Sequence, residues 1–300
     1  MSPEHVRPRR YAEGMSFDLH THSNISDGTQ PPADVVASAK RAGLQGLALT
    51  DHDTTAGWAE AVRAAEEQEI LLIPGMEITT LTEDRISVHL LSYLHDPAHP
   101  GLTAAIRSAR RGREARARRM VELLGRDFPL TWEGVQAQVS EGATVGRPHL
   151  ADALVAVGVV EDRQEAFDRL LHRGSPYYVS QDNIHPAEAI RLVREAGGVP
   201  VIAHAMAAAR GRTVSQDQLE EMVQAGLAGV EVWHRDNPEE GRQALLALAR
   251  RHDLLVTGSS DYHGAGKPNL IGENTTDLRT VEQILERASG STPAGRLPLH

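Results

Sequence analysis

Short apolar runs recur along this chain, and seven of them end on a histidine or a carboxylate. A short continuous apolar run is typical of a strand that is buried on both faces, as in a parallel sheet. The polar ends of the seven runs are His20-Thr21-His22, Asp51-His52, Glu77, His89, His204, Glu231 and Asp261-Tyr262-His263. Because the active sites of α/β barrels collect at the C-terminal ends of the strands, the pattern predicts one shared site.

Helical patterns separate most of these runs, so strand and helix alternate from residue 15 to about residue 94 and again after residue 186. Between residues 103 and 178 the strand signal disappears and helical patterns replace it. We expect helices over 33–42, 56–68, 104–124, 132–139, 149–157, 163–172, 186–196, 216–225 and 238–252. We interpret residues 102–183 as a helical insertion over the barrel mouth, inside one catalytic domain of residues 15–300, with residues 1–14 as an N-terminal tail.

Composition narrows the possible function classes. Of the 300 residues, 40% are hydrophobic but only 4% are aromatic, so we expect a core of Ala, Val, Leu and Ile. The net charge of −10 argues against binding nucleic acid through overall charge. The chain has no cysteine, which excludes disulfides, a thiolate nucleophile and a thiolate zinc site. Its 15 histidines instead favour metal ligation by nitrogen and oxygen.

The sequence shows no sign of a membrane protein. No stretch reaches the roughly eighteen consecutive apolar residues of a membrane span. Residues 1–14 lack the apolar segment of a secretory signal. We therefore expect a cytoplasmic enzyme with no membrane partner and no obligatory protein partner.

The polar strand ends carry the side chains of a metal site. Side chains at positions i and i+2 of a strand point to the same face. His20 and His22 can therefore bind one ion together, and so can Asp261 and His263. Glu77 can bridge two ions with its two oxygens. One histidine at a strand end is usually structural, but so many at consecutive strand ends indicate a metal centre. Its candidate ligands are His20, His22, Asp27, His52, Glu77, His89, His204, Asp261 and His263.

Five short motifs contain most of these side chains: His20-Thr21-His22-Ser23, Ser26-Asp27-Gly28, Leu49-Thr50-Asp51-His52-Asp53, Gly75-Met76-Glu77 and Ser260-Asp261-Tyr262-His263. Together they resemble the motifs of the polymerase and histidinol phosphatase (PHP) superfamily. Gly146-Arg147-Pro148-His149, followed by Ala151-Asp152-Ala153-Leu154, matches a branch of phosphoesterases that act on nucleoside 3′,5′-bisphosphates and are also described as 5′-to-3′ exoribonucleases. The resemblance implies an α/β fold, a distorted (β/α)7 barrel, with two or three divalent metal ions. Manganese is the first expectation, and zinc or iron are the alternatives.

The resemblance also implies how the ligands are shared between ions. One ion would be held by His20, His22, Glu77 and Asp261. A second would share Glu77 and add His89 and His204, and a third would use Asp27, His52 and His263. The chain departs from the family pattern at Ala205, where a proline is usual, and in the segment after Glu231, which affects the expected substrate preference.

Such a centre predicts in-line attack on a phosphate by a metal-bridging hydroxide, without a covalent intermediate. Nothing in the sequence suggests a covalent nucleophile. His263 or Asp51 is a candidate for proton transfer to the leaving oxygen. Asp51 can equally orient an imidazole, and we favour that interpretation.

Substrate contacts are expected outside the ligand set. Arg147 and His149 begin a helix, where an arginine fork and a helix N-terminus both suit a phosphate; an ordinary helix start is the alternative. Lys267, in a glycine-rich loop, is a candidate for a second phosphate, and Arg235 is a weaker one; solvated side chains are the alternative.

A run of arginines between residues 107 and 119 is the strongly basic stretch of the sequence. It is either a track for an RNA strand or a solvated helix face, and the absence of interleaved aromatic residues favours the latter. Trp233 is a candidate to stack on a base, although core packing is the more ordinary role.

These features predict a metal-dependent phosphoric ester hydrolase. The specific prediction is removal of the 3′-phosphate of nucleoside 3′,5′-bisphosphates, extended to 5′-to-3′ hydrolysis of short RNA, so that a phosphorylated nucleotide or short RNA is the substrate. The alternatives are a phosphatase for a small phosphomonoester such as histidinol phosphate, and a non-catalytic metal-binding module. A metal-dependent amide hydrolase commonly needs a bridging lysine, and Lys40 and Lys267 are not placed for it.

Overall fold

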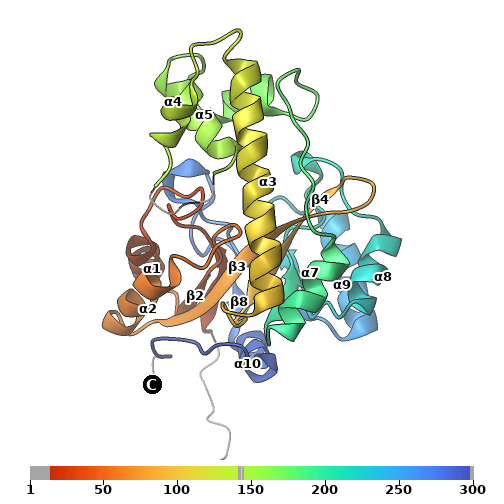
Figure 1. Ribbon diagram of the computed structural model, residues 1–300. Helices are drawn as coiled ribbons and strands as arrows, with labels where there is room; N and C mark the ends of the chain where they lie inside the picture. Colours follow the sequence, from red (N-terminus) through yellow and green to blue (C-terminus); the bar gives the residue numbers. More distant parts are fainter. Residues whose placement is uncertain (1–13, 141–142, 144, 298–300) are drawn as a thin grey trace, which may run out of the picture.

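A nearly closed barrel of strands forms the centre of the protein (Figure 1). The computed structural model describes residues 14–140, 143 and 145–297, so the predicted tail, apart from Gly14, lies outside the described residues. The strands follow the order β7-β6-β5-β4-β3-β2-β1-β8. They are β1 (Ser16–Thr21), β2 (Gly46–Leu49), β3 (Leu71–Leu81), β4 (Ser87–Tyr93), β5 (Val199–Ile202), β6 (Gly229–Trp233), β7 (Leu255–Gly258) and β8 (Thr276–Asp277).

The two ends of the sheet meet through hydrogen bonds made at the end of β7 and just beyond it. The His22 N–H donates to the Tyr262 carbonyl at 2.8 Å, and the Gly258 N–H donates to Thr276 Oγ1 at 3.0 Å. These contacts bring the last of the seven predicted strands beside the first. The two-residue strand β8, which the apolar pattern did not indicate, pairs antiparallel with β1.

One strand runs against the direction that a fully parallel sheet would require. β4 is antiparallel to both β3 and β5, whereas the pairs β1–β2, β2–β3, β5–β6 and β6–β7 are parallel. Residues 82–86 are too few for a parallel crossover, so β3 and β4 must form a hairpin. As a result the beginning of β4 lies at the barrel mouth, and His89, its third residue, still reaches the shared site.

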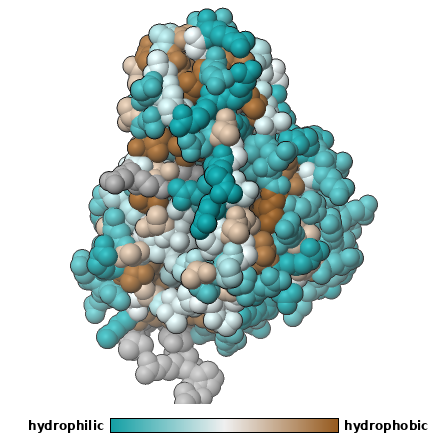
Figure 2. All heavy atoms as spheres, viewed as in Figure 1, coloured by the Kyte–Doolittle hydropathy of each residue, from teal (hydrophilic) through white to brown (hydrophobic). Residues whose placement is uncertain are grey.

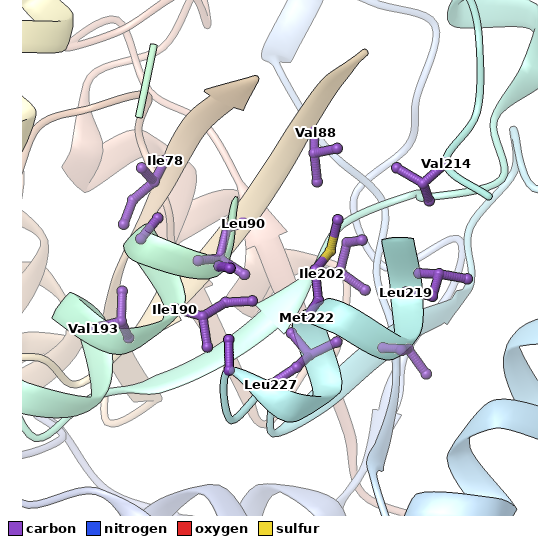
Figure 3. Close-up of a cluster of buried hydrophobic side chains, with 14 of the residues drawn as sticks. Ile78, Val88, Leu90, Ile190, Val193, Ile202, Val214, Leu219, Met222 and Leu227 are labelled. Atoms are coloured by element: carbon purple, nitrogen blue, oxygen red, sulfur yellow. The ribbon is translucent and has the colours of Figure 1, made fainter. Parts of the chain in front are cut away.

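Apolar side chains fill the barrel and bind the helices to its outer face. Phe17, Leu19, Ile73, Leu91 and Val201 belong to the interior cluster. Figure 3 shows the outer cluster, in which Ile78, Val88 and Leu90 from the sheet face side chains of α7 and α8. The surrounding helices are α1 (Pro32–Arg41), α2 (Trp58–Glu67), α7 (Pro186–Glu195), α8 (Gln216–Gln224), α9 (Glu239–His252) and α10 (Leu278–Arg287).

The helices that replace the strand pattern form a projecting lobe (Figure 1). They are α3 (Pro100–Leu124), α4 (Trp132–Gln136), α5 (Arg147–Ala156), α6 (Arg163–Ala166) and a π-helix (Phe167–Leu171). Met120, Leu124, Leu150, Leu154 and Leu171 form an apolar cluster of their own here. The extent of the insertion and the assignment of one domain stay predictions.

The outward faces of α8 and α9 are mostly hydrophilic (Figure 2). Among the described helices, none combines the length and the apolar character that crossing a membrane requires.

Candidate metal centre and its surroundings

The structure brings the nine predicted ligands together at the barrel mouth. Ligand atoms within each of three groups lie within 4.8 Å of one another. The groups are His20, His22, Glu77 and Asp261; His22, Asp27, His52 and His263; and His52, Glu77 and His89. The first group is the set that the resemblance implies for one ion. The third differs from the implied set, because it contains His52 in place of His204.

Glu77 lies at the middle of the centre and uses both of its oxygens. Its Oε1 lies 2.7 Å from Nδ1 of His89 and 3.3 Å from Nε2 of His204. Its Oε2 faces the other imidazoles: it lies 3.1 Å from His22 Nε2, 3.2 Å from His52 Nδ1 and 3.3 Å from His20 Nε2. The carboxylate therefore has the two-sided placement that bridging two ions requires.

Asp261 and Asp27 complete the centre on either side of His22. Oδ1 of Asp261 lies 3.4 Å from Nε2 of His22 and 3.5 Å from Nε2 of His20. Oδ1 of Asp27 lies 3.1 Å from Nε2 of His263, whose ring stacks on that of His22 at 4.1 Å between centroids. The side chains come from separate strands and loops, so the barrel fixes their relative positions.

The donor atoms fit a divalent transition metal. Nε2 of His20, His22 and His263 and Nδ1 of His52 are buried and have no hydrogen-bond partner among the described residues. They lie close to carboxylate oxygens yet without hydrogen-bond geometry, so each ring nitrogen is free to bind an ion once it has lost its proton. Imidazole nitrogen with carboxylate oxygen suits manganese, zinc and iron, and the nine residues would hold such ions between them.

The charges of the centre are arranged for a cation. Burial acts to raise the pKa of Glu77, but His52, His89 and His20 outweigh it and hold the pKa well below its usual range. Burial likewise opposes ionisation of Asp27, yet His263 and His52 lower its pKa well below normal. The carboxylates of Glu77 and Asp27 are therefore ionised and supply the negative charge that a cation requires.

Several of the imidazoles remain neutral. Burial lowers the pKa of His204 to about 3, with Arg210 adding to the effect, and lowers that of His263 to about 4, with Lys267 adding to it. For His22, burial is outweighed by Asp261 and Glu77, which raise its pKa to about 9. Neutral imidazoles have free lone pairs, which metal ligation requires.

Buried carboxylates behind the ligands fix their orientation. Oε1 of Glu231 lies 3.0 Å from Nδ1 of His20, and Oε2 accepts the backbone N–H of His204 at 2.7 Å. Ser259 Oγ donates to the same Glu231 side chain at 2.5 Å. A carboxylate bound to the far nitrogen of an imidazole sets its tautomer and direction. Two residues of the centre, His204 and Asp261, also adopt positive φ angles of 30° and 56°, a strained backbone that is found most often at functional sites.

Asp51 supports the loop that carries Asp27. Its Oδ1 accepts hydrogen bonds from the Ser23 N–H at 2.8 Å and Ser26 Oγ at 2.7 Å, and its Oδ2 accepts from Ser23 Oγ at 2.6 Å. Ser26 Oγ in turn lies 3.4 Å from Nδ1 of His22. Asp51 thus reaches an imidazole only through a serine, and its role in proton transfer stays a prediction.

The predicted substrate residues are not gathered in one place. Nζ of Lys267 lies 2.9 Å from Oδ2 of Asp261, directly at the centre. Arg235 instead binds Asn269 Oδ1 at 3.1 Å and lies 3.2 Å from Glu273, and within the described part of the chain it makes no polar contact with the predicted ligands. His149 is buried, and its Nδ1 accepts the Gly146 N–H at 3.1 Å.

Arg147 belongs to a cluster of four arginines beside the centre. Burial lowers its pKa, Tyr178 opposes this, and Arg113 and Arg173 lower it further. Burial lowers the pKa of Arg116 to about 10, and Arg147, Arg113 and Arg173 all contribute. We call Arg113, Arg116, Arg147 and Arg173 the arginine cluster.

The arginine cluster is poorly neutralised. Arg113 donates to the Asp53 carboxylate and to Thr79 Oγ1, and Asp53 Oδ1 also accepts the Thr79 N–H at 2.9 Å. Among the described residues, the contact between Arg113 and Asp53 is the ion pair that the cluster makes. Nη2 of Arg116 and Nε of Arg113 are buried without a hydrogen-bond partner in the same part of the chain.

Comparison with known proteins identifies the family of the chain. Residues 18–132 match the model of the PHP domain. A 3′,5′-nucleoside bisphosphate phosphatase from Chromobacterium violaceum is 34% identical over 267 residues, covering 89% of this chain and 93% of that protein. The chain belongs to the PHP family. A 5′-3′ exoribonuclease from Haemophilus influenzae is also 34% identical, over 90% of this chain and 98% of its own length.

Solved structures agree with the PHP assignment. A protein from Bifidobacterium adolescentis, assigned as a metal-dependent phosphoesterase, is 49% identical and superposes with a TM-score of 0.90 over 92% of this chain and 97% of its own. A second, described as an amidohydrolase from Chromobacterium violaceum with bound sulfate and no metal, has a TM-score of 0.79 and 31% identity over 91% and 97% of the two chains. The PHP chain is therefore a hydrolase, a metal-dependent phosphoesterase.

One residue of the PHP centre escaped the sequence analysis. Arg210 follows His204 by six residues and binds Asp261 Oδ2 at 2.7 Å. The apolar pattern ends at His204, and a lone arginine among alanines carries no recognisable motif. In the arginine cluster, Arg147 was a predicted substrate residue, Arg113 and Arg116 were visible only as part of the basic run, and Arg173 carried no signal in the sequence.

Proposed function

We propose that this phosphoesterase removes the 3′-phosphate of nucleoside 3′,5′-bisphosphates, and that 5′-to-3′ hydrolysis of short RNA is an extension of the same chemistry. Two named relatives with about a third of their residues identical support this, one a 3′,5′-nucleoside bisphosphate phosphatase and the other a 5′-3′ exoribonuclease. Both substrates present a 5′-phosphate next to the phosphoester that is cleaved. An enzyme for them needs one site for the reacting phosphate and another for the 5′-phosphate.

The observation that carries the proposal is the arginine cluster beside the metal centre. Four guanidinium groups repel one another, three of them partly buried, and among the described residues Arg113 alone has a carboxylate partner, Asp53. Burying a charge without a partner is costly, so such a cluster favours an anion. Guanidinium forks bind phosphate oxygens in pairs, which matches a terminal 5′-phosphate.

The residues of the chain have separate roles in this proposed reaction. The divalent ions, when bound, supply Lewis-acid activation of water and neutralise charge on the phosphate. Glu77, Asp261 and Asp27 give the ions their anionic ligands, and Glu231 holds His20 and His204 in place. Arg147 anchors the 5′-phosphate within the arginine cluster, which fixes the orientation of the nucleotide before the 3′ phosphoester is attacked. Proton transfer by His263 stays a prediction.

The test compares phosphate release from adenosine 3′,5′-bisphosphate, 3′-AMP and 5′-AMP in the presence of manganese. We expect kcat/KM to be higher for the bisphosphate than for 3′-AMP, and Asp261→Asn to abolish release from both. Arg147→Gln should lower the value for the bisphosphate by about 10–100-fold, the worth of a hydrogen bond to a charged group, and leave 3′-AMP nearly unchanged.

Arg169→Gln is the matched control, because Arg169 lies in the same helical region and pairs with Glu165 at the surface. Equal turnover of the bisphosphate and the monophosphates would contradict the 5′-phosphate anchor. Release from histidinol phosphate alone would favour a small-metabolite phosphatase.

A further inference from the structure

Two cations meet at one oxygen of a predicted metal ligand. Oδ2 of Asp261 lies 2.7 Å from Nη2 of Arg210 and 2.9 Å from Nζ of Lys267. We propose that Arg210, together with Lys267, binds the phosphoryl group that is cleaved, and is a catalytic residue of the centre. The proposal rests on phosphoester chemistry at this centre, and it does not depend on the identity of the nucleoside.

The position of Arg210 is fixed by the fold. It ends a 3-10 helix, η2 (Ala208–Arg210), in the loop that follows β5 and His204. On its other edge, Nε donates to Oδ2 of Asp236 at 2.6 Å. Asp236 therefore acts as a positioning residue that holds the guanidinium towards the centre.

The two oxygens of Asp261 face different surroundings. Oδ1 faces the imidazoles of His20 and His22, whereas Oδ2 faces the two cations. The Asp261 side chain is only 2% exposed, but those of Arg210 and Lys267 are 30% and 32% exposed. The cations thus cover the buried carboxylate on its solvent side, where an incoming phosphate meets them first.

The charge balance favours an anion at this place. Two positive groups share one carboxylate oxygen, and Asp236 offsets only part of the remaining charge. Metal ligation by Asp261 would draw its electron density towards the ions and leave Arg210 and Lys267 less neutralised. A phosphoryl group gains negative charge on its non-bridging oxygens as the ester bond breaks, so fixed cations there stabilise the transition state.

A purely structural role makes a different prediction. If Arg210 only held Asp261 in place, its removal would weaken the binding of metal, and phosphate binding would recover once metal was restored. If Arg210 binds the phosphoryl group, metal content stays and phosphate affinity falls. The two roles can therefore be separated by measuring metal and phosphate independently.

The experiment uses the full chain loaded with manganese and three variants: Arg210→Gln, Arg210→Lys and the control Arg212→Gln. Arg212 lies in the same loop but binds the Asp84 carbonyl, away from the centre. Manganese content is measured by elemental analysis, and the dissociation constant of inorganic phosphate by calorimetry. Activity is then measured on adenosine 3′,5′-bisphosphate.

We expect Arg210→Gln to keep its manganese, to bind phosphate about 10-fold more weakly and to lose about 10²-fold in kcat. Arg210→Lys should recover part of both losses, because it keeps the charge but not the fork. The control should match the unmodified chain. Lost manganese with normal phosphate affinity at excess metal would overturn the proposal, as would unchanged affinity in Arg210→Gln.

Failure of the bisphosphate as a substrate would not obscure the result. Inorganic phosphate binding does not involve the nucleoside, so it still reports on Arg210 if the proposed function is wrong.

Discussion

The metal centre and the arginine cluster lie near each other, yet their charges are arranged in opposite ways. At the centre, buried carboxylates and imidazoles alternate, and each side chain is fixed by its own strand or loop. In the cluster, side chains of one sign come from the helical region, and among the described residues Arg113 alone has a carboxylate partner, Asp53. The charges of the centre suit cations, and those of the cluster suit an anion. A bisphosphate substrate would need both.

Breaking the centre should have the largest effect. Glu77→Gln removes the charge from the carboxylate that contacts five imidazoles, so metal affinity and transition-state stabilisation should both fall. We expect kcat/KM to drop by about 10³-fold or more, together with loss of bound metal. Steady-state kinetics and elemental analysis test this. Glu122→Gln, an exposed carboxylate that pairs with Arg119, is the control, and retained activity in Glu77→Gln would argue against a bridging role.

Removing the metal should destabilise the whole chain. An ion that binds only the folded state adds about 2.7 kcal/mol at 100 times its dissociation constant. For a chain of this size the midpoint of thermal unfolding should fall by roughly 5 °C on chelation. Calorimetry with and without a chelator measures the change. An unchanged midpoint would mean that the centre is held together without ions.

The cluster should respond to phosphate even when metal is absent. Inorganic phosphate at ten times its dissociation constant should raise the unfolding midpoint of the metal-free chain by about 3 °C. Arg116→Gln should lose at least half of this rise, because the Nη2 of Arg116 is buried without a partner. Arg119→Gln, on the exposed side of the same helix, should keep it. An equal rise in both variants would place the bound phosphate elsewhere.

The smallest expected difference is in pH dependence. The pKa of His204 is about 3 in the folded chain, below its ordinary value of 6.5, so between these values the unfolded chain binds a proton that the folded chain does not. The stability of the metal-free chain should therefore fall as pH drops from about 6.5. His204→Gln should make the unfolding midpoint less dependent on pH below 6.5. The arginines stay charged in this range, so Arg116→Gln should leave the slope unchanged.

The sequence predicted most of the barrel and the positions of the candidate ligands because all of them except Asp27 lie at the end of an apolar run. The end of a strand can be recognised from the local sequence, and the barrel brings the strand ends together regardless of the conformation of the loops. The reversal of β4 was hidden, since a buried strand has the same apolar pattern in either direction. His89 was nonetheless placed correctly at the mouth, because it lies near the start of the reversed strand.

Contacts between distant loops could not be predicted in the same way. Arg210 and Asp261 are 51 residues apart, and no spacing rule joins them. In the basic run, Arg113 and Arg116 face the site whereas Arg118 and Arg119 pair with neighbouring glutamates at the surface. Only burial separates these two groups, and burial depends on how α3 packs. Arg235 has the right residue type and position in the chain, but Asn269 and Glu273 hold it.

Asp53 couples the position of α3 to that of the loop at the barrel mouth. It follows His52 directly in the chain, accepts the backbone N–H of Thr79 in β3, and binds Arg113 of α3. A single side chain thus joins the long helix of the lobe to the loop that carries a predicted metal ligand. Any tilt of α3 that accompanies occupation of the arginine cluster would pull on this loop, so recognition of one phosphate and the geometry around the other would change together.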